Sequence, residues 1–182
     1  IIDWSDRSTC VLFGDGAGAV VLVPSDEAGR GVLSVRIGSD GEQGEVPYLP
    51  AGGSRHPATH ETVEQHLHFV HMSGNDLFKT AVRGMELVAR QALDDVGIGA
   101  GEIDLLVPHQ ANFRIIDATA RRLEVPMDKV VVNIDRYGNT SAASIPIALD
   151  EAMKGGRIRP GSTIVMVAFG GGLTWGAAVV KW

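Results

Sequence analysis

The stretch from residue 103 to residue 123 reads IDLLVPHQANFRIIDATARRL, and it decides the class of fold. Its first part, Ile103–Val107, is an apolar run that predicts a buried strand. A helix is predicted from Asn112 to Leu123, with apolar positions that recur at helical spacing and face inward: Phe113, Ile116, Ala120 and Leu123. A strand that passes through a short polar turn into a helix is typical of α/β proteins.

The alternation continues toward the C-terminus. Val130–Ile134 is predicted to be a short extended piece, and Ser141–Lys154 a helix that tolerates Pro146 near its start. Thr163–Phe169 and Trp175–Val180 then predict two strands, joined through three consecutive glycines in a hairpin-like connection. The pattern indicates layers of helices around a largely buried mixed sheet.

The N-terminal part predicts further elements. Ala17–Val23 is a β-branched run that predicts a buried strand, and Gly31–Ile37 predicts a second one. Residues 39–64 are rich in Gly, Pro and charge and predict a long loop, while Gln65–Met72 alternates as an extended segment does. A helix capped by Ser73 or Asn75 should run to about Val96, with these apolar positions: Leu77, Phe78, Ala81, Val82, Met85, Val88 and Ala89.

Length and composition set the limits. The 182 residues make one domain or half of a larger one, and 45% hydrophobic with 21% charged residues is a globular composition. A net charge of −6 argues against nucleic acid as the main partner, and no apolar run is long enough to span a membrane. A single cysteine forms no internal disulfide. We expect a soluble, cytoplasmic protein that has lost an N-terminal part, because the chain opens at Ile1 without an initiator methionine.

Two tempting motifs do not carry chemistry. The glycine cluster Gly14–Ala19 loosely matches a dinucleotide fingerprint, but a strand-like run follows it where a helix is required, so tight structural turns are the better interpretation. Five of the six histidines lie between His56 and His71. No cysteine or carboxylate set accompanies them, so we interpret them as solvated side chains and expect no metal site.

Two strand-to-helix junctions are better candidates. His109 follows the predicted strand at Val107, and Asn139 lies between an extended segment and a helix. Ligands and catalytic groups of α/β proteins gather at such carboxyl ends. A lone His or Asn there is equally compatible with capping or packing, so the residues alone leave both interpretations open.

Four stretches, taken together, are similar to a known family. They occur in the family's order: Phe13–Ala19 (FGDGAGA), Pro108–Asn112 (PHQAN), Gly138–Ser144 (GNTSAAS) and Phe169–Gly176 (FGGGLTWG). The chain resembles the C-terminal half of β-ketoacyl-acyl-carrier-protein synthase III, the initiating condensing enzyme of dissociated fatty-acid synthesis. The resemblance covers the chain from about Asp6 to Trp182. It implies a thiolase-like fold of two similar βαβαββ halves, of which residues 1–182 are the second.

The resemblance also implies a reaction. A nucleophilic cysteine in the first half, upstream of Ile1, takes an acyl group from acyl-coenzyme A. Malonyl-carrier protein then loses CO2, and its enolate attacks the acyl-enzyme. His109 and Asn139 match the catalytic His and Asn, whose donors face the thioester oxygen, and one such donor contributes about 3–4 kcal/mol. Gly171 is the expected backbone donor to the acyl-transfer oxyanion.

The same comparison assigns binding roles. Arg7 matches a residue that packs on the adenine of coenzyme A, and the following residues would line the pantetheine tunnel: Gly74, Asn75, Phe78, Ala111, Asn112 and Phe169. An acidic carrier protein would be met by Lys79, Arg114, Arg121 and Arg122, although a solvated helix face is an equally simple interpretation of these cations. Coenzyme A enters as a thioester substrate, no cofactor is implied, and the full enzyme is expected to be a homodimer.

The sequence is compatible with other acyl groups, other acceptors and a role without catalysis. Residues 41–70 are longer than the family form, which leaves the acyl-chain preference open. A relative with another acceptor would make an ester, an amide or a quinolone, and a non-catalytic half would only pair with a partner. Cys10 lies in the apolar run CVLF, so we expect a buried, inert thiol there and not the nucleophile.

Overall fold

A four-stranded mixed sheet forms the centre of the computed structural model, which describes residues 1–43, 47–72 and 74–182, without the side chains of residues 43 and 74–77. The strands are β1 (Gly31–Ser39), β2 (Leu105–Pro108), β3 (Thr163–Gly170) and β4 (Thr174–Lys181). Their order is β1-β4-β3-β2, in which β2 and β3 are parallel and β4 is antiparallel to both of its neighbours. The predicted strands 31–37, 163–169 and 175–180 and the connection through Gly170–Gly172 are confirmed.

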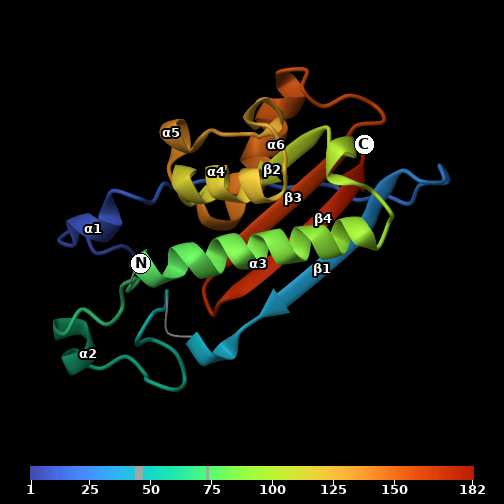
Figure 1. Cartoon of the computed structure of the whole chain (residues 1–182). Coiled ribbons are helices and arrows are strands. Elements are labelled where there is room, and N and C mark those ends of the chain that lie inside the picture. The colour runs from blue at the N-terminus through green and yellow to red at the C-terminus, as the bar shows by residue number, and fades with distance from the viewer. Residues whose placement is uncertain (44–46, 73) are drawn as a thin grey trace.

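Helices cover the sheet (Figure 1). They are α1 (Arg7–Cys10), α2 (His60–Glu64), α3 (Gly74–Asp94), α4 (Phe113–Arg122), α5 (Ile134–Tyr137) and α6 (Ser144–Lys154). Single 3-10 turns lie at Gly41–Gln43, Ala100–Glu102, Met127–Lys129 and Ser141–Ala143. From α3 onward the main helices and strands follow the alternation that the sequence predicts, and the long helix α3 lies across one face of the sheet.

The core lies on both faces of the sheet. On one face α3 and α4 pack through Met85, Val88 and Ile116 against Leu106 and Val165. On the other face α6 packs through Ala148 and Ala152 against Leu105, Val107 and Ile164. Neighbouring residues of one strand, such as Leu105 and Leu106, thus enter different cores, as the period of two in a strand requires. Burial on both faces explains why these strands are continuous apolar runs.

Helix α4 begins where the sequence predicts, because Asn112 caps it: its side-chain oxygen accepts a hydrogen bond from Arg114 N at 2.8 Å. Ile116, Ala120 and Leu123 are fully buried, as predicted. Phe113 is 52% exposed, so its predicted inward orientation is wrong. As the first helical residue, it lies at the end of α4, beyond the packed turns.

The region between residues 39 and 72 differs from the prediction. A short helix, α2, interrupts the predicted loop, and a reciprocal pair of hydrogen bonds between Thr59 and Thr62 caps it. The predicted extended segment 65–72 forms turns instead, and only His71 pairs in a strand-like way, with Tyr48. Within the residues that the structure describes, no strand lies beside residues 65–70, and a period of two alone does not create a sheet.

The largest difference concerns the segment 13–23, which we call the N-terminal strap. The predicted strand Ala17–Val23 is absent, and Val20, Val21 and Leu22 are 68%, 88% and 78% exposed. A strand needs a neighbour for its N–H and C=O groups, and none lies beside these residues in the part of the chain that the structure describes. The prediction of a buried strand is therefore wrong for this chain by itself.

The glycines of the strap lie in an extended path and not in turns, which corrects the interpretation of Gly14–Ala19. A Cβ added to Gly14 would come within 2.1 Å of Tyr137 O, and one on Gly18 within 2.3 Å of Pro146 Cγ. The strap thus passes so close to the segment around Asn139 and to the start of α6 that only glycine fits. None of the helices that the structure describes is long and apolar enough to cross a membrane.

Candidate active site

His109 lies directly after β2, at the carboxyl end of the parallel pair β2–β3. Its backbone N–H donates to Val167 O at 2.8 Å and so continues the pairing by one residue. The backbone at His109 is therefore held by the sheet, and the side chain leaves it toward the N-terminus of α6. This is the kind of strand end at which the sequence predicts chemistry.

The Ser144 hydroxyl is the hydrogen-bond partner of His109 Nδ1. Ser144 Oγ, at the start of α6, lies 2.6 Å from His109 Nδ1, and it accepts the backbone N–H of Gln110 at 3.3 Å. A hydroxyl can donate to Nδ1 or accept from it, and in the arrangement in which the Ser144 O–H donates, the ring proton resides on Nε2. In that tautomer Nε2 is a hydrogen-bond donor.

Burial keeps His109 neutral. Loss of solvent around the ring lowers the pKa of His109 from 6.5 to about 4. The imidazole is therefore uncharged at neutral pH, and the ring N–H that it keeps is a neutral donor. A donor of this kind stabilises a developing oxyanion without requiring a second buried charge.

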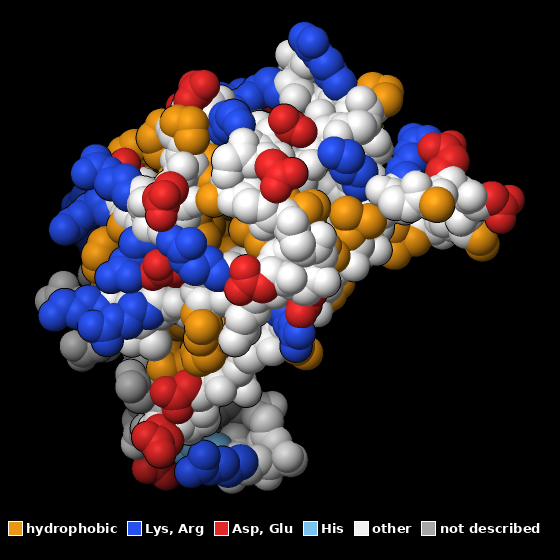
Figure 2. Space-filling view, turned by 45° about the vertical axis from the view of Figure 1, so that its right-hand side comes forward, with side chains coloured by type: hydrophobic (Ala, Val, Ile, Leu, Met, Phe, Trp, Pro, Cys, Tyr) orange, Lys and Arg blue, Asp and Glu red, His pale blue; other side chains and the backbone are white. Residues whose placement is uncertain are grey.

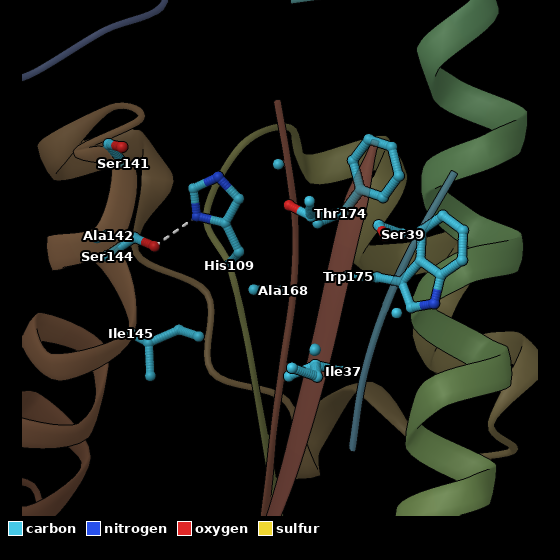
Figure 3. Close-up of a pocket in the computed structure, with 14 residues that line it drawn as sticks. Ile37, Ser39, His109, Ser141, Ala142, Ser144, Ile145, Ala168, Thr174 and Trp175 are labelled. Atoms are coloured by element: carbon cyan, nitrogen blue, oxygen red, sulfur yellow. Dashed lines mark hydrogen bonds between the residues drawn. The ribbon is translucent and has the colours of Figure 1, made fainter. Parts of the chain in front are cut away.

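A cavity of about 680 Å³ lies in front of His109. Figure 3 shows His109 and Ser144 on one side and Trp175 on the other, with β3 and β4 between them. The cavity is mostly apolar and is lined by Ile37, Gly38, Ser39, His109, Ser141, Ala142, Ser144, Ile145, Ala168, Phe169, Gly170, Thr174, Trp175 and Gly176. An apolar cavity with a few convergent polar groups is the usual form of a small-molecule site.

Trp175 forms the far wall of this cavity. Its ring stacks on Phe169 with centroids 6.3 Å apart and planes 6° apart. A Cβ on Gly38 would lie 2.3 Å from Trp175 Nε1, and one on Gly84 would lie 3.0 Å from its ring. Two glycines, one on β1 and one on α3, therefore make room for the indole.

Asn139 is held by backbone pairing with residues 12–14. Its N–H donates to Leu12 O at 2.8 Å, and its carbonyl accepts from Gly14 N at 3.1 Å, so the strap runs alongside it. Its side-chain Oδ1 accepts the backbone N–H of Ser141 at 2.9 Å. With Oδ1 used in this way, the two N–H bonds of the amide remain available to a ligand.

The structure places His109 and Asn139 at adjacent cavities. Asn139 lines a second cavity of about 460 Å³, together with Phe13, Asp15 and Tyr48. Ser141 lines both cavities. Ser141 also adopts a left-handed backbone, with φ of 53°, which is uncommon for a residue other than glycine and is typical of functional sites.

The other residues that the resemblance assigns to the site are dispersed. Phe169 lines the cavity of His109, but Gly171 does not: Gly170 lines it, and Gly171 faces Pro47 across the turn. Asn112 and Ala111 lie at the start of α4, and Phe78 contacts Arg114. Arg7 is exposed on α1. Gly74 and Asn75 begin α3, but their side chains lie outside the described residues.

The predicted basic surface is partly neutralised. Arg121 pairs with Asp117 at 3.1 Å and Arg122 with Glu86 at 2.5 Å, while Arg114 lies over the Phe78 ring at 5.5 Å. Lys79 is exposed on α3. Figure 2 shows Lys and Arg side chains gathered at one side of the molecule, with Asp and Glu side chains among them.

The histidine cluster and Cys10 lie elsewhere. His66 bonds to Asp3 at 2.9 Å and His68 to Thr62 at 2.9 Å. Among the described residues, no group of three or more His, Cys, Asp and Glu side chains is arranged to hold a metal ion. Cys10 ends α1 and is partly buried, with the next residue, Val11, 67% exposed, so the predicted full burial is wrong.

Sequence reasoning missed Ser144, Ser141 and Trp175. All three lie in the quoted motifs GNTSAAS and FGGGLTWG, so the signal was present. Their roles depend on contacts across the fold, such as that between His109 and Ser144, 35 residues apart in the chain. A single sequence does not reveal such a pairing.

The fold defines a class: it is thiolase-like, with a mixed sheet between helices. The family model "3-Oxoacyl-[acyl-carrier-protein (ACP)] synthase III C terminal" matches residues 93–182, and "3-Oxoacyl-[acyl-carrier-protein (ACP)] synthase III" matches residues 1–41. The chain belongs to the β-ketoacyl-acyl-carrier-protein synthase III family.

Individual relatives agree. The chain is 58% identical over 182 residues to beta-ketoacyl-[acyl-carrier-protein] synthase III of Desulfitobacterium hafniense (strain DSM 10664 / DCB-2), covering all of this chain and 55% of the relative. The 3-oxoacyl-[acyl-carrier-protein] synthase III of Aquifex aeolicus VF5 superposes with a TM-score of 0.88 at 47% identity, covering 100% and 54% of the two chains. The priming β-ketosynthase of the R1128 polyketide biosynthetic pathway gives 0.84 at 37%, covering 100% and 53%. The chain thus spans about half the length of the relatives it matches.

Proposed function

We propose that this chain works as the C-terminal part of a longer condensing enzyme. That enzyme joins an acyl group from acyl-coenzyme A to the two-carbon unit of malonyl-carrier protein and releases CO2. The observation that carries the proposal is His109, a buried neutral imidazole that bonds to Ser144 through Nδ1 at the wall of an apolar cavity and so leaves Nε2 for the proposed donor role. The names of the relatives, which include a polyketide priming synthase, support initiation of either fatty-acid or polyketide synthesis.

The first half-reaction is acyl transfer. A cysteine thiolate in the preceding part of the enzyme attacks the thioester carbon of acyl-coenzyme A. The electron pair moves onto the carbonyl oxygen, and its return expels the coenzyme A thiolate, which takes up a proton. A backbone N–H from the Gly170–Gly172 turn, with Gly171 as the predicted donor, stabilises the intermediate oxyanion. The chain alone is then inactive, because it supplies no such nucleophile.

The second half-reaction uses His109 and Asn139. The bond between the malonyl methylene and its carboxylate breaks, CO2 leaves, and the electron pair forms an enolate whose charge resides on the thioester oxygen. His109 Nε2–H and the Asn139 amide donate hydrogen bonds to that oxygen. The enolate carbon then attacks the acyl carbon, and the cysteine thiolate leaves. A neutral His109 suits this step, since a charged imidazolium would bind the malonyl carboxylate in the ground state and hold it back from reaction.

The binding roles remain part of the same proposal. Phe78, Ala111, Asn112 and Phe169, together with Gly74 and Asn75, line the path of the pantetheine arm, and Arg7 packs on the adenine. Lys79, Arg114, Arg121 and Arg122 contact the acidic carrier protein. Since Arg121 and Arg122 already pair with carboxylates, we expect Lys79 and Arg114 to contribute the most to docking.

The test separates the two half-reactions in the full-length protein that carries this chain. His109→Ala and Asn139→Ala should each lower the rate of CO2 release from malonyl-carrier protein about 100-fold, as loss of one oxyanion donor does. Acyl-enzyme formation should stay within about threefold of wild type. Cys10→Ala, a control at a partly buried thiol outside the site, should change neither rate. Slow acylation with normal CO2 release in the His109 and Asn139 variants would contradict the assigned roles.

A further inference from the structure

Helix α6 contacts both loops of the candidate site through one face. Ser144, at its first position, bonds to His109 and Gln110. Glu151 lies seven residues later, two turns along the same face and about 10 Å away. It contacts the segment that leads into Asn139. One helix thus contacts both the residues that follow β2 and the short helix α5, which directly precedes Gly138 and Asn139.

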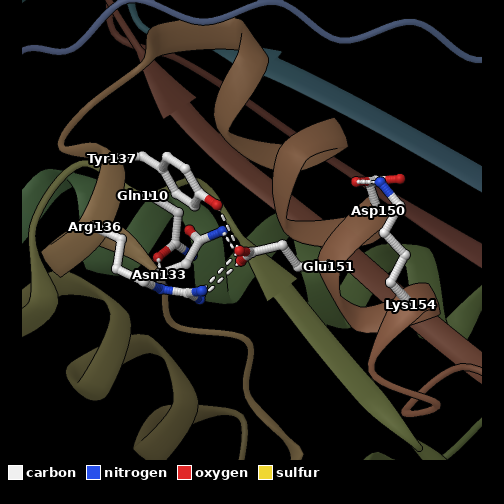
Figure 4. Close-up of polar contacts among 7 residues, drawn as sticks. All are labelled: Gln110, Asn133, Arg136, Tyr137, Asp150, Glu151 and Lys154. Carbon is white, nitrogen blue, oxygen red and sulfur yellow. Dashed lines mark hydrogen bonds and ion pairs between the residues drawn. The ribbon is translucent and has the colours of Figure 1, made fainter.

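Glu151 accepts hydrogen bonds from three residues of one short segment (Figure 4). Its Oε1 accepts from Tyr137 OH at 2.6 Å and from Arg136 Nη1 at 2.8 Å. Its Oε2 accepts from Asn133 Nδ2 and Arg136 Nη2, both at 2.8 Å. All three donors lie on α5 or directly before it, and α5 is followed by Gly138 and Asn139.

Gln110 connects Ser144 to Asn133. It is 1% exposed, and its Oε1 accepts the backbone N–H of Asn133 at 3.0 Å. Its Nε2 donates to Pro108 O at 2.8 Å and to Val131 O at 3.0 Å. The contacts therefore form a closed ring that runs from Ser144 to Gln110, to Asn133, to Glu151 and back along α6.

Glu151 is charged in this ring. Burial alone would raise the pKa of Glu151, but hydrogen bonds from Tyr137 and Asn133 and the Arg136 guanidinium outweigh it and hold the pKa below its usual value. The carboxylate has four acceptor positions, which the three donors use with one bidentate arginine. An isosteric amide would place an NH2 group against one of these donors.

We propose that Glu151 is a positioning residue: through Asn133 and α5 it holds Asn139 at a fixed distance from His109. The inference rests on the proposed function and deepens it. Glu151 touches no substrate and acts on decarboxylation alone, because acyl transfer depends on a different oxyanion donor. The acyl-transfer rate therefore serves as an internal measure of overall structure.

The neighbouring residue provides a matched control. Asp150 pairs with Lys154 at 2.7 Å on the exposed side of α6, away from the ring, as Figure 4 shows. Glu151→Gln and Asp150→Asn remove the same charge from adjacent positions of one helix. Only the first opens the ring.

The experiment measures CO2 release and acyl-enzyme formation in the full-length protein, beside the thermal unfolding temperature. We expect Glu151→Gln to lower CO2 release at saturating malonyl-carrier protein about tenfold and acylation less than twofold, and Asp150→Asn to change neither. In the Asn139→Ala background, Glu151→Gln should have no further effect on CO2 release, because the two residues act through one group.

Several results would overturn the inference. Equal losses of both rates in Glu151→Gln, or a full additive loss on top of Asn139→Ala, would show a general structural role. Unchanged CO2 release in Glu151→Gln would show that the ring does not act on the site. If instead His109→Ala and Asn139→Ala leave decarboxylation intact, the proposed function fails. The outcomes of the two proposals are therefore distinguishable.

Discussion

The central sheet and the N-terminal strap both have apolar, strand-like sequences. Only the sequences in the sheet form buried strands. In the sheet, Leu106 and Val165 are fully buried, and each strand has a partner. In the strap, Val20–Val23 are an equally apolar run, but they are exposed and unpaired in the chain that the structure describes. An apolar, β-branched run therefore indicates a preference for a buried strand. The strand forms only where another segment lies beside it.

Only one end of the strap belongs firmly to the rest of the chain. Phe13 pairs with Asn139 in a parallel bridge, and the glycines 14, 16 and 18 fit closely against Tyr137, Thr140 and Pro146. Residues 15–23 are all exposed, and beyond Gly18 the strap has no glycine fitted against α6. The strap thus joins the Asn139 loop to a region that we expect the full-length protein to complete.

The largest effect on the free energy of unfolding is expected at Val21, which is 88% exposed in this chain. In the full-length protein we expect a strand neighbour to bury it, so Val21→Asp should lower the free energy of unfolding by about 3 kcal/mol or more, because it buries an unpaired charge. Met153→Asp, at an exposed apolar position near the end of α6, should cost less than about 1 kcal/mol. Denaturant unfolding measures both values. Equal costs would mean that the strap stays exposed.

A smaller effect is expected where the strap meets the site. The Cβ of Gly14→Ala would lie 2.1 Å from Tyr137 O, so the strap must move away from Asn139. We expect a loss of about 2 kcal/mol in unfolding free energy, in the range that overpacking usually costs, with a reduced rate of CO2 release. Gly101→Ala is the control, since a Cβ there meets no atom within 4 Å. A stable Gly14→Ala with normal decarboxylation would show that the strap does not support Asn139.

Much of the fold could be predicted from local patterns. The strands around Leu106, Val165 and Val179 are apolar runs, the helices α3 and α4 carry helical periodicity, and each of these elements packs against others in this chain. The predictions failed where strand formation or burial depends on a neighbouring segment. These places are the strap, residues 65–72, and Phe113 at the end of a helix. A pattern gives the preference of a segment, and tertiary contacts decide whether it is realised.

The site was predictable only in part for a related reason. His109 and Asn139 stand at strand-to-helix junctions, which sequence can identify. Ser144 and Glu151 influence them through the fold, since Glu151 meets Asn133 18 residues away and Ser144 meets His109 35 residues away. The helical spacing of Ser144 and Glu151 places them on one face, but nothing in the spacing shows which loops that face contacts.

We propose above that His109 acts as a neutral donor through Nε2. Nuclear magnetic resonance of the two ring nitrogens in the full-length protein measures directly which of them carries the proton. At pH 7 we expect a proton on Nε2 and none on Nδ1, and a titration midpoint near pH 4. Because this pKa lies below the unfolded value of 6.5, His109 takes up its proton first in the unfolded state. Its contribution to stability is therefore complete above pH 6.5 and is lost as the pH falls through 4. A proton on Nδ1, or a titration midpoint at or above pH 6.5, would contradict the role of His109 as a neutral donor through Nε2.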